Sequence, residues 1–149
     1  MMSISIPVSA ASVDTEVTPY EKAGISTIIS AKEFDSIVPT SVITEDVYLP
    51  RANAGGTNGN PCGEFTANVS NVSFNITYAT GGTQTYNVQL YKGTIANGGT
   101  MKANYETLTI GSGFTRSNLK IGSTYFFKVS SYDCHTSGAN ATYTLKTYN

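Results

Sequence analysis

The chain has 149 residues, a formal net charge of −1 at pH 7 and 13% charged residues, against roughly a quarter in ordinary soluble domains. This length suits one domain with its own hydrophobic core. The near-zero charge, without any basic cluster, argues against nucleic acid as a partner. No run approaches the ~20 apolar residues of a membrane span, so we expect no membrane insertion. Abundant Ser, Thr, Asn and Gly, with ten Tyr, favour short strands and turns.

Residues 1–30 are predicted to be a separate N-terminal segment, and residues 31–149 the globular domain. The run from Ile4 to Ser12 resembles the end of a secretory signal peptide, with a small-residue cleavage pattern that ends at Ala10. We therefore expect an exported protein that works outside the cell or at its surface. A flexible N-terminal tail is the alternative. Within this segment, residues 24–30 can form an edge strand.

The two cysteines, Cys62 and Cys134, fit an oxidising compartment. Two cysteines alone cannot form a zinc site, and neither lies in a Cys-x-x-Cys motif. We predict that they pair as a disulfide, which would close a loop of about 70 residues and stabilise the fold by roughly 4 kcal/mol. Two free thiols are the alternative.

Strand patterns recur along the rest of the chain. Residues 41–49 are predicted to form a strand bounded by Pro39 and Pro50. A loop rich in Gly and Asn follows at 54–61. Apolar and polar side chains then alternate through residues 72–78, which is typical of a strand with one apolar face.

A second alternating run, residues 86–91, follows the Gly81-Gly82 turn, so we expect the two runs to pair as a β-hairpin. Further strands are predicted around 108–110, 125–129 and 143–145. Strands at this spacing predict an all-β fold, an antiparallel β-sandwich of two sheets. Helical periodicity extends over no more than a turn or two anywhere in the sequence.

Leu119, Gly122 and Tyr125 have the spacing of a tyrosine corner at the start of a strand. In that structural device the Tyr hydroxyl bonds to nearby backbone and ties the two sheets of an immunoglobulin-like sandwich together. These three residues are therefore predicted to fix the scaffold, which does not by itself fix a function.

Residues 65–148 resemble a fibronectin type III or related immunoglobulin-like module. Residues 114–129 are similar to that family's corner and following strand, and residues 86–91 to its third strand. Residues 13–20 resemble the start of small, mostly uncharacterised exported bacterial proteins. The resemblance implies a secreted or surface module and carries no activity with it.

The sequence contains few residues that could carry out catalysis. His135 follows Asp133 and Cys134, but neighbouring residues in a strand point to opposite faces, which opposes a Cys-His pair. A Ser or Thr nucleophile would need a base, and His135 is the only histidine. We therefore assign no catalytic residue and no cofactor, and we expect no enzyme.

Oxygen ligands for calcium could come from Glu45, Asp46 and Asp133 with loop carbonyls around residues 58–60. No Asp-x-Asp-x-Asp loop is present, so a solvated loop is the preferred interpretation and no metal site is assigned. Four Asn-x-Ser/Thr sequons are interpreted as polar, outward-facing positions; they begin at Asn68, Asn71, Asn75 and Asn140.

The tyrosines are the remaining lead. Alternation places Tyr78, Tyr86, Tyr125 and Tyr143 on the apolar face of their strands. It places Tyr91, Tyr132 and Tyr148 on the other face, where exposed rings can stack on sugars or anchor a protein contact. These three residues form the predicted binding surface, with scattered surface aromatics as the alternative.

Two hypotheses for the function follow. The first is an exported, non-catalytic binding or adhesion module for an unknown protein or glycan. The second is a structural subunit of a surface fibre, which would self-associate by adding the alternating Ile4, Ile6 and Val8 as a strand to a neighbouring subunit. A small hydrolase is a minor alternative.

Overall fold

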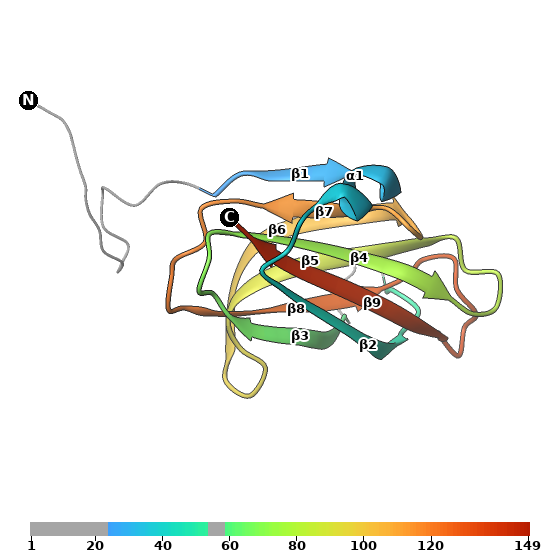
Figure 1. The fold of residues 1–149 in the computed structure, drawn as a ribbon. Coiled ribbons are helices and arrows are strands. Elements are labelled where there is room, and N and C mark those ends of the chain that lie inside the picture. Colours follow the sequence, from blue (N-terminus) through green and yellow to red (C-terminus); the bar gives the residue numbers. More distant parts are fainter. Residues whose placement is uncertain (1–23, 54–58) are drawn as a thin grey trace, which may run out of the picture.

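The computed structural model of this protein describes residues 24–53 and 59–149. Figure 1 shows two layers of strands with a short helix at one end. One sheet has five strands in the order β1-β7-β4-β9-β2, and the other has four in the order β3-β8-β5-β6. Every pairing between these strands is antiparallel. The predicted all-β sandwich of two antiparallel sheets is confirmed.

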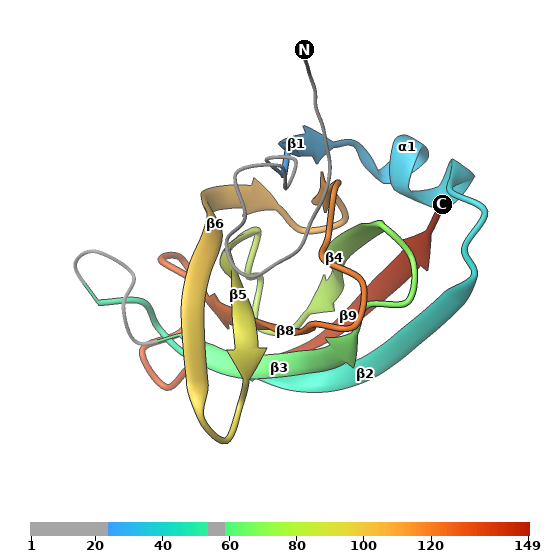
Figure 2. The same cartoon turned by 90° about the vertical axis from the view of Figure 1, so that its left-hand side faces the viewer.

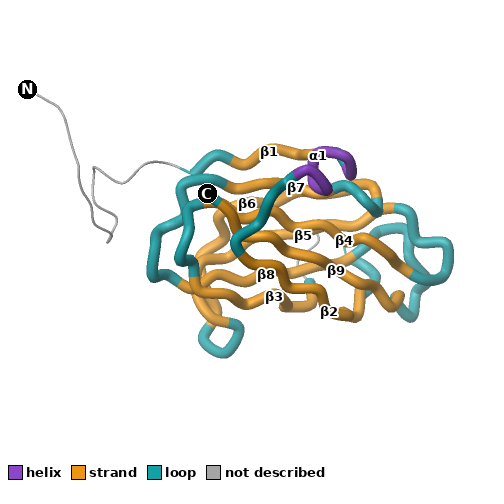
Figure 3. The backbone as a smooth tube through the Cα atoms, viewed as in Figure 1, coloured by secondary structure: helices purple, strands orange, loops and turns teal. Residues whose placement is uncertain are grey.

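Strands account for most of the described chain (Figure 3). Their bounds are β1 (Ser26–Ile29), β2 (Ser41–Leu49), β3 (Asn60–Thr66), β4 (Asn71–Ala79), β5 (Thr85–Thr94), β6 (Gly98–Thr109), β7 (Gly113–Arg116), β8 (Thr124–Ser130) and β9 (Ala139–Tyr148). The helix is α1 (Ala31–Ser36).

The edge strand expected within residues 24–30 is β1, which pairs with β7 through Ser26↔Arg116 to Ile29↔Gly113. This part of the predicted N-terminal segment therefore belongs to the sandwich. The signal-peptide pattern and the candidate donor strand at Ile4, Ile6 and Val8 lie outside the described residues.

The predicted hairpin between residues 72–78 and 86–91 is wrong. β4 pairs with β7 and β9 in one sheet, whereas β5 pairs with β6 and β8 in the other. The Gly81-Gly82 turn is present, with φ of 69° and 72°, but it carries the chain from one sheet to the other. A period of two identifies the apolar face of a strand and leaves its neighbour undetermined.

β9 departs from the immunoglobulin arrangement. In immunoglobulin domains the strand after the corner strand stays in the same sheet. Here β8 lies in the four-stranded sheet, and β9 crosses to the other sheet, where it lies between β4 and β2. The last strand is therefore connected differently from that of an immunoglobulin domain, and among the described strands β9 is the one that pairs with β2.

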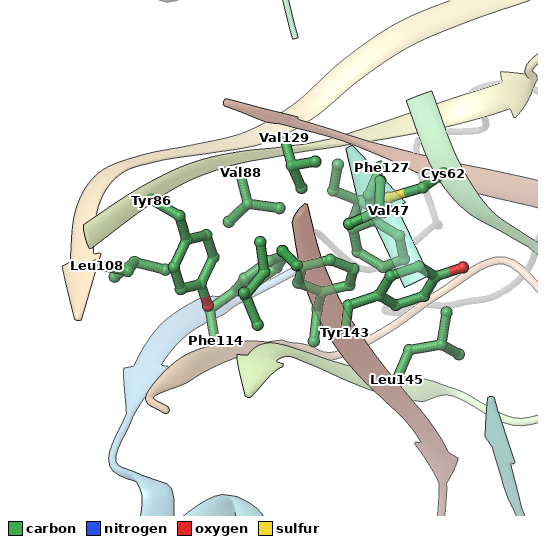
Figure 4. Close-up of a cluster of buried hydrophobic side chains, with 14 of the residues drawn as sticks. Val47, Cys62, Tyr86, Val88, Leu108, Phe114, Phe127, Val129, Tyr143 and Leu145 are labelled. Atoms are coloured by element: carbon green, nitrogen blue, oxygen red, sulfur yellow. The ribbon is translucent and has the colours of Figure 1, made fainter. Parts of the chain in front are cut away.

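The core lies between the sheets and is built around aromatic rings (Figure 4). Phe74 from β4 lies 4.4 Å from Phe127 of β8 and 5.3 Å from Tyr143 of β9, measured between ring centroids. Tyr86 is also fully buried, and its hydroxyl donates to the carbonyl of Ser112 at 2.6 Å. Burying each such side chain stabilises the fold by about 1.5–3 kcal/mol.

The helix α1 begins at a capping box. Ser30 Oγ accepts from the Glu33 backbone N–H, and the Glu33 carboxylate accepts from the Ser30 N–H. Phe34 is buried, and Lys146 of β9 donates to its carbonyl while the ammonium lies 4.5 Å from its ring centroid. Figure 2 shows α1 beside the end of β9 accordingly.

The predicted corner residues lie where the chain turns into β8. The Tyr125 hydroxyl is 2.8 Å from the backbone nitrogen of Lys120 and accepts its hydrogen bond. Leu119 is buried, and Gly122 has a φ of 89°. The Gly122 N–H donates to the carbonyl of Ala67, which joins the corner to the segment after β3.

The predicted disulfide is wrong, because Cys62 and Cys134 are both free and buried. Cys62 lies opposite Phe127 in the pairing of β3 with β8. Cys134 follows β8, and its thiol faces the carbonyls of Leu49 and Ser131 at 3.8 and 3.7 Å. Burial rather than a covalent link accounts for both residues, since free Cys is among the most buried residue types.

Candidate functional site

A shallow groove lies on the outer face of the five-stranded sheet, where β2, β9 and β4 are adjacent. Its volume is about 390 Å³. The residues that line it are Asp46, Val47, Tyr48, Tyr78, Asn140, Ala141 and Thr142. We call this feature the Tyr48–Tyr78 groove.

Alternation along β2 aims polar and aromatic groups at the groove. Val47 and Leu49 are buried, so Tyr48, which lies between them, and Asp46, which precedes Val47, face outward. Tyr48 is 49% exposed. The same alternation holds along β9, where Asn140 is exposed between two buried alanines.

Tyr78 reaches the groove because β4 is irregular. Its pairing with β9 shifts register between Ile76 and Tyr78, so the alternation seen from Val72 to Ile76 does not continue. Tyr78 is 58% exposed, and the expectation that it lies on the core face is wrong. A bulge changes the face of every later residue in a strand, and the sequence pattern contains no sign of it.

The Tyr48 ring is held by the turn that precedes β9. Its hydroxyl donates to the carbonyl of Ser137 at 2.7 Å. A Cβ atom placed on Gly138 would lie 2.4 Å from the Tyr48 hydroxyl oxygen, so the ring packs directly on the glycine backbone. Because Gly138 has no side chain and a φ of 87°, the turn and the ring fit together. The ring orientation is therefore set before any ligand arrives.

The floor of the groove is polar and incompletely paired. Thr142 Oγ1 lies 3.1 Å from Asp46 Oδ1 and donates to it. Among the described residues, the other Asp46 oxygen and the Asn140 side-chain amide have no hydrogen-bond partner. One carboxylate oxygen and one amide group are thus available to a ligand.

The three tyrosines of the predicted binding surface are not brought together. Tyr91 lies on the four-stranded sheet, stacked on Phe126 with centroids 5.2 Å apart, and the Lys128 ammonium lies 4.9 Å from its ring. Tyr132 follows β8, and its hydroxyl is 3.5 Å from a Glu106 oxygen.

Tyr148 lies on the five-stranded sheet, where its hydroxyl bonds to the hydroxyls of Ser73 and Thr115. All three tyrosines are half-buried. Tyr48 and Tyr78 are the exposed tyrosines that share a surface, and the sequence reasoning missed them. The signal for Tyr48 was its position between Val47 and Leu49 in the strand predicted at 41–49.

The groups considered for catalysis stay apart or are engaged in structure. His135 is exposed while its neighbour Cys134 is buried with its thiol directed at backbone carbonyls. Asp133 accepts bonds from the Ser131 hydroxyl and the Thr85 N–H. Within residues 24–53 and 59–149, no group of three His, Cys, Asp or Glu side chains could hold a metal ion.

Glu45, considered as a calcium ligand, is engaged at the seam between β2 and β9. The Tyr143 hydroxyl donates to its carboxylate at 2.5 Å. Burial is the main cause that raises the pKa of Tyr143, and the hydrogen bond to Glu45 raises it further. Burial, with a smaller contribution from Glu45, also raises the pKa of the Cys62 thiol from 9.0 to about 12. The Cys62 thiol is therefore protonated and unreactive at neutral pH.

The sequons differ in accessibility. Asn68 and Asn140 are exposed and Asn71 is half-buried. Asn75 is only 2% exposed and donates to the carbonyl of Gly111. The interpretation of all four as outward-facing surface positions is therefore wrong for Asn75.

The fold defines the class of protein, an all-β sandwich of two antiparallel sheets. A comparison with protein-family models, with curated proteins and with solved structures finds no match to this chain. In the part of the chain that the structure describes, no helix has the length and apolar character needed to cross a membrane.

Proposed function

We propose that this protein is a non-catalytic binding module that attaches to a surface ligand through the Tyr48–Tyr78 groove, as an exported or surface-located protein. The observation that carries the proposal is the pair of exposed tyrosines flanking one groove with unpaired polar groups on its floor. Aromatic rings with a few converging polar groups are the usual composition of a ligand site.

The rigidity of the surroundings supports binding. The groove is built on three paired strands, and Tyr48 is held by Ser137 and Gly138. A side chain that is already ordered loses little entropy when a ligand binds. The low charge of the chain suits a module that has to avoid non-specific electrostatic contacts.

The test is an adhesion measurement with the labelled protein. Surfaces coated with extracellular proteins, surfaces coated with polysaccharides, and intact cells form the panel. We expect saturable binding to at least one surface, and at least a tenfold loss of affinity in Tyr48→Ala and in Tyr78→Ala. Tyr132→Ala is the matched control and keeps full binding. Absence of binding to every surface, or binding that both groove variants retain, would overturn the proposal.

A further inference from the structure

The groove on β2, β9 and β4 carries a more specific conclusion, which rests on the proposed function. Four properties of the groove bear on the class of its ligand. They are the two tyrosine rings, the polar floor, the charge of the lining residues, and the direction in which the groove extends across the sheet. Each property limits the classes of ligand that could bind there.

The two rings offer flat apolar faces to a ligand. Tyr48 has one side against Gly138, and Tyr78 makes no hydrogen bond or ring contact within the described residues. An aromatic face is negative, and it attracts the slightly positive C–H groups that cover one side of a sugar ring. Burying those C–H groups also removes apolar area from water.

The polar floor matches hydroxyl groups. A sugar hydroxyl both donates and accepts, and the floor supplies an acceptor at the free Asp46 oxygen and a donor and acceptor at the Asn140 amide. A carboxylate that accepts from a neutral hydroxyl makes a stronger bond than two neutral partners would.

Charge excludes several other ligands. Among the residues that the structure describes, Asp46 is the only charged one that lines the groove, so phosphates, sulfates and uronates would be repelled. One carboxylate provides too few oxygen ligands to hold calcium. The carboxylate therefore disfavours anionic ligands, and among sugars it favours neutral ones.

Geometry argues against an extended peptide and for a chain of sugars. A peptide that adds as a strand needs a sheet edge, whereas the groove lies on a sheet face and includes β9, which is paired on both sides. Neighbouring strands are about 4.8 Å apart, and Tyr48 and Tyr78 pair with β9 residues two positions apart, Asn140 and Thr142, so their backbones are separated by roughly 12 Å across β9. A chain of several sugar rings spans this separation more fully than one ring does.

We infer that the Tyr48–Tyr78 groove binds a neutral oligosaccharide or polysaccharide, with one sugar ring on each tyrosine and ligand hydroxyls bonded to Asp46 and Asn140. Longer chains bind more tightly than monosaccharides because they reach both rings.

Isothermal titration with defined sugars tests this inference. The neutral probes are oligosaccharides of glucan, mannan and xylan, each compared with its monosaccharide, and the anionic probe is oligogalacturonate. We expect at least one neutral oligosaccharide to bind at least tenfold more tightly than its monosaccharide and than oligogalacturonate. Asp46→Asn tests the carboxylate and is expected to weaken that binding three- to tenfold, while Tyr132→Ala leaves it unchanged.

The outcomes separate this inference from the proposed function. Adhesion that depends on Tyr48 and Tyr78 but is competed by soluble protein and not by any neutral sugar would overturn the inference and leave the binding module in place. Preferential binding of oligogalacturonate would overturn it as well. Loss of groove-dependent adhesion altogether would remove both.

Discussion

The hydroxyl oxygen of Tyr125 accepts a hydrogen bond of 2.8 Å from the backbone N–H of Lys120, five residues earlier in the chain. The bond closes the turn that leads into β8, and Tyr125 itself is 4% exposed. The ring also stacks on Phe65 of β3, with centroids 5.7 Å apart. One side chain thus joins a turn, its own strand and the neighbouring strand of the sheet.

We expect Tyr125→Phe to lower the free energy of unfolding by about 1–3 kcal/mol, because the Lys120 N–H loses its partner while the ring remains packed. Chemical denaturation measures the change. Tyr132→Phe is the control, since its hydroxyl makes only a long contact of 3.5 Å with Glu106. A neutral Tyr125→Phe would mean that the bond contributes nothing to the stability of the corner.

Alkaline pH should destabilise the fold through Cys62. The folded-state pKa is raised from 9.0 to about 12, so this group stabilises the protein fully below pH 9. Above pH 9 the unfolded chain releases the proton first, and stability falls until pH 12. Between pH 8 and pH 10 the loss is about 1 kcal/mol.

Urea denaturation across this range, compared with the Cys62→Ala variant, measures the effect. The variant has a lower overall stability because a buried thiol is removed, but its slope against pH should be flatter than that of the wild-type protein. Equal slopes would contradict the assigned burial of the Cys62 thiol.

Both thiols should be free and shielded. We expect the intact mass of the unreduced protein to correspond to two thiols, without the loss of two hydrogens that a disulfide causes. Ellman's reagent should react with Cys62 and Cys134 quickly in denaturant and slowly in the native protein, because both side chains are buried. A mass lower by two hydrogens would show that the two cysteines form a disulfide and would contradict this prediction.

Gly138 should act as a positioning residue for Tyr48. A methyl group there would lie 2.4 Å from the Tyr48 hydroxyl oxygen, and the φ of 87° is unfavourable for Ala. We expect Gly138→Ala to cost about 1–2 kcal/mol of stability. It should also weaken ligand binding, because the ring can no longer lie on the turn.

Gly122→Ala is the matched control for backbone strain. Its φ of 89° is similar, but a Cβ atom there meets nothing within 4 Å. A comparable loss of stability with unchanged binding in Gly122→Ala would separate strain from the position of Tyr48. Equal binding by both variants would contradict the positioning role of Gly138.

The sequence predicted those features that depend on local pattern. The strand predicted at residues 41–49 matches β2, and the spacing of Leu119, Gly122 and Tyr125 places the Tyr hydroxyl on nearby backbone. The Ser30-to-Glu33 spacing is also a helix-start signal, and attention to it would have located α1. Local patterns succeed because the residues that make the interaction are close together in the chain.

Features that depend on contacts between distant parts of the chain could not be predicted from the sequence. Which sheet β4 and β5 join is decided by strands far along the chain, and the outward position of Tyr78 depends on a bulge against β9. The Tyr48–Tyr78 groove depends on both the strand order and the bulge, because Tyr48 and Tyr78 come from strands that β9 separates. The predicted disulfide between Cys62 and Cys134 is wrong for the same reason, since spacing along the chain does not determine the direction of the side chains.

The position of β9 between β4 and β2 has a consequence for the order of events during synthesis. Among the described strands, β2 pairs with β9 alone, in a register that runs from Ser41↔Thr147 to Leu49↔Ala139. At about 5–20 residues per second, a ribosome needs roughly five to twenty seconds to make the chain that separates these strands. Throughout that interval β2 has been synthesised and its partner has not, so the five-stranded sheet and the groove between Tyr48 and Tyr78 can form only after β9 has been made.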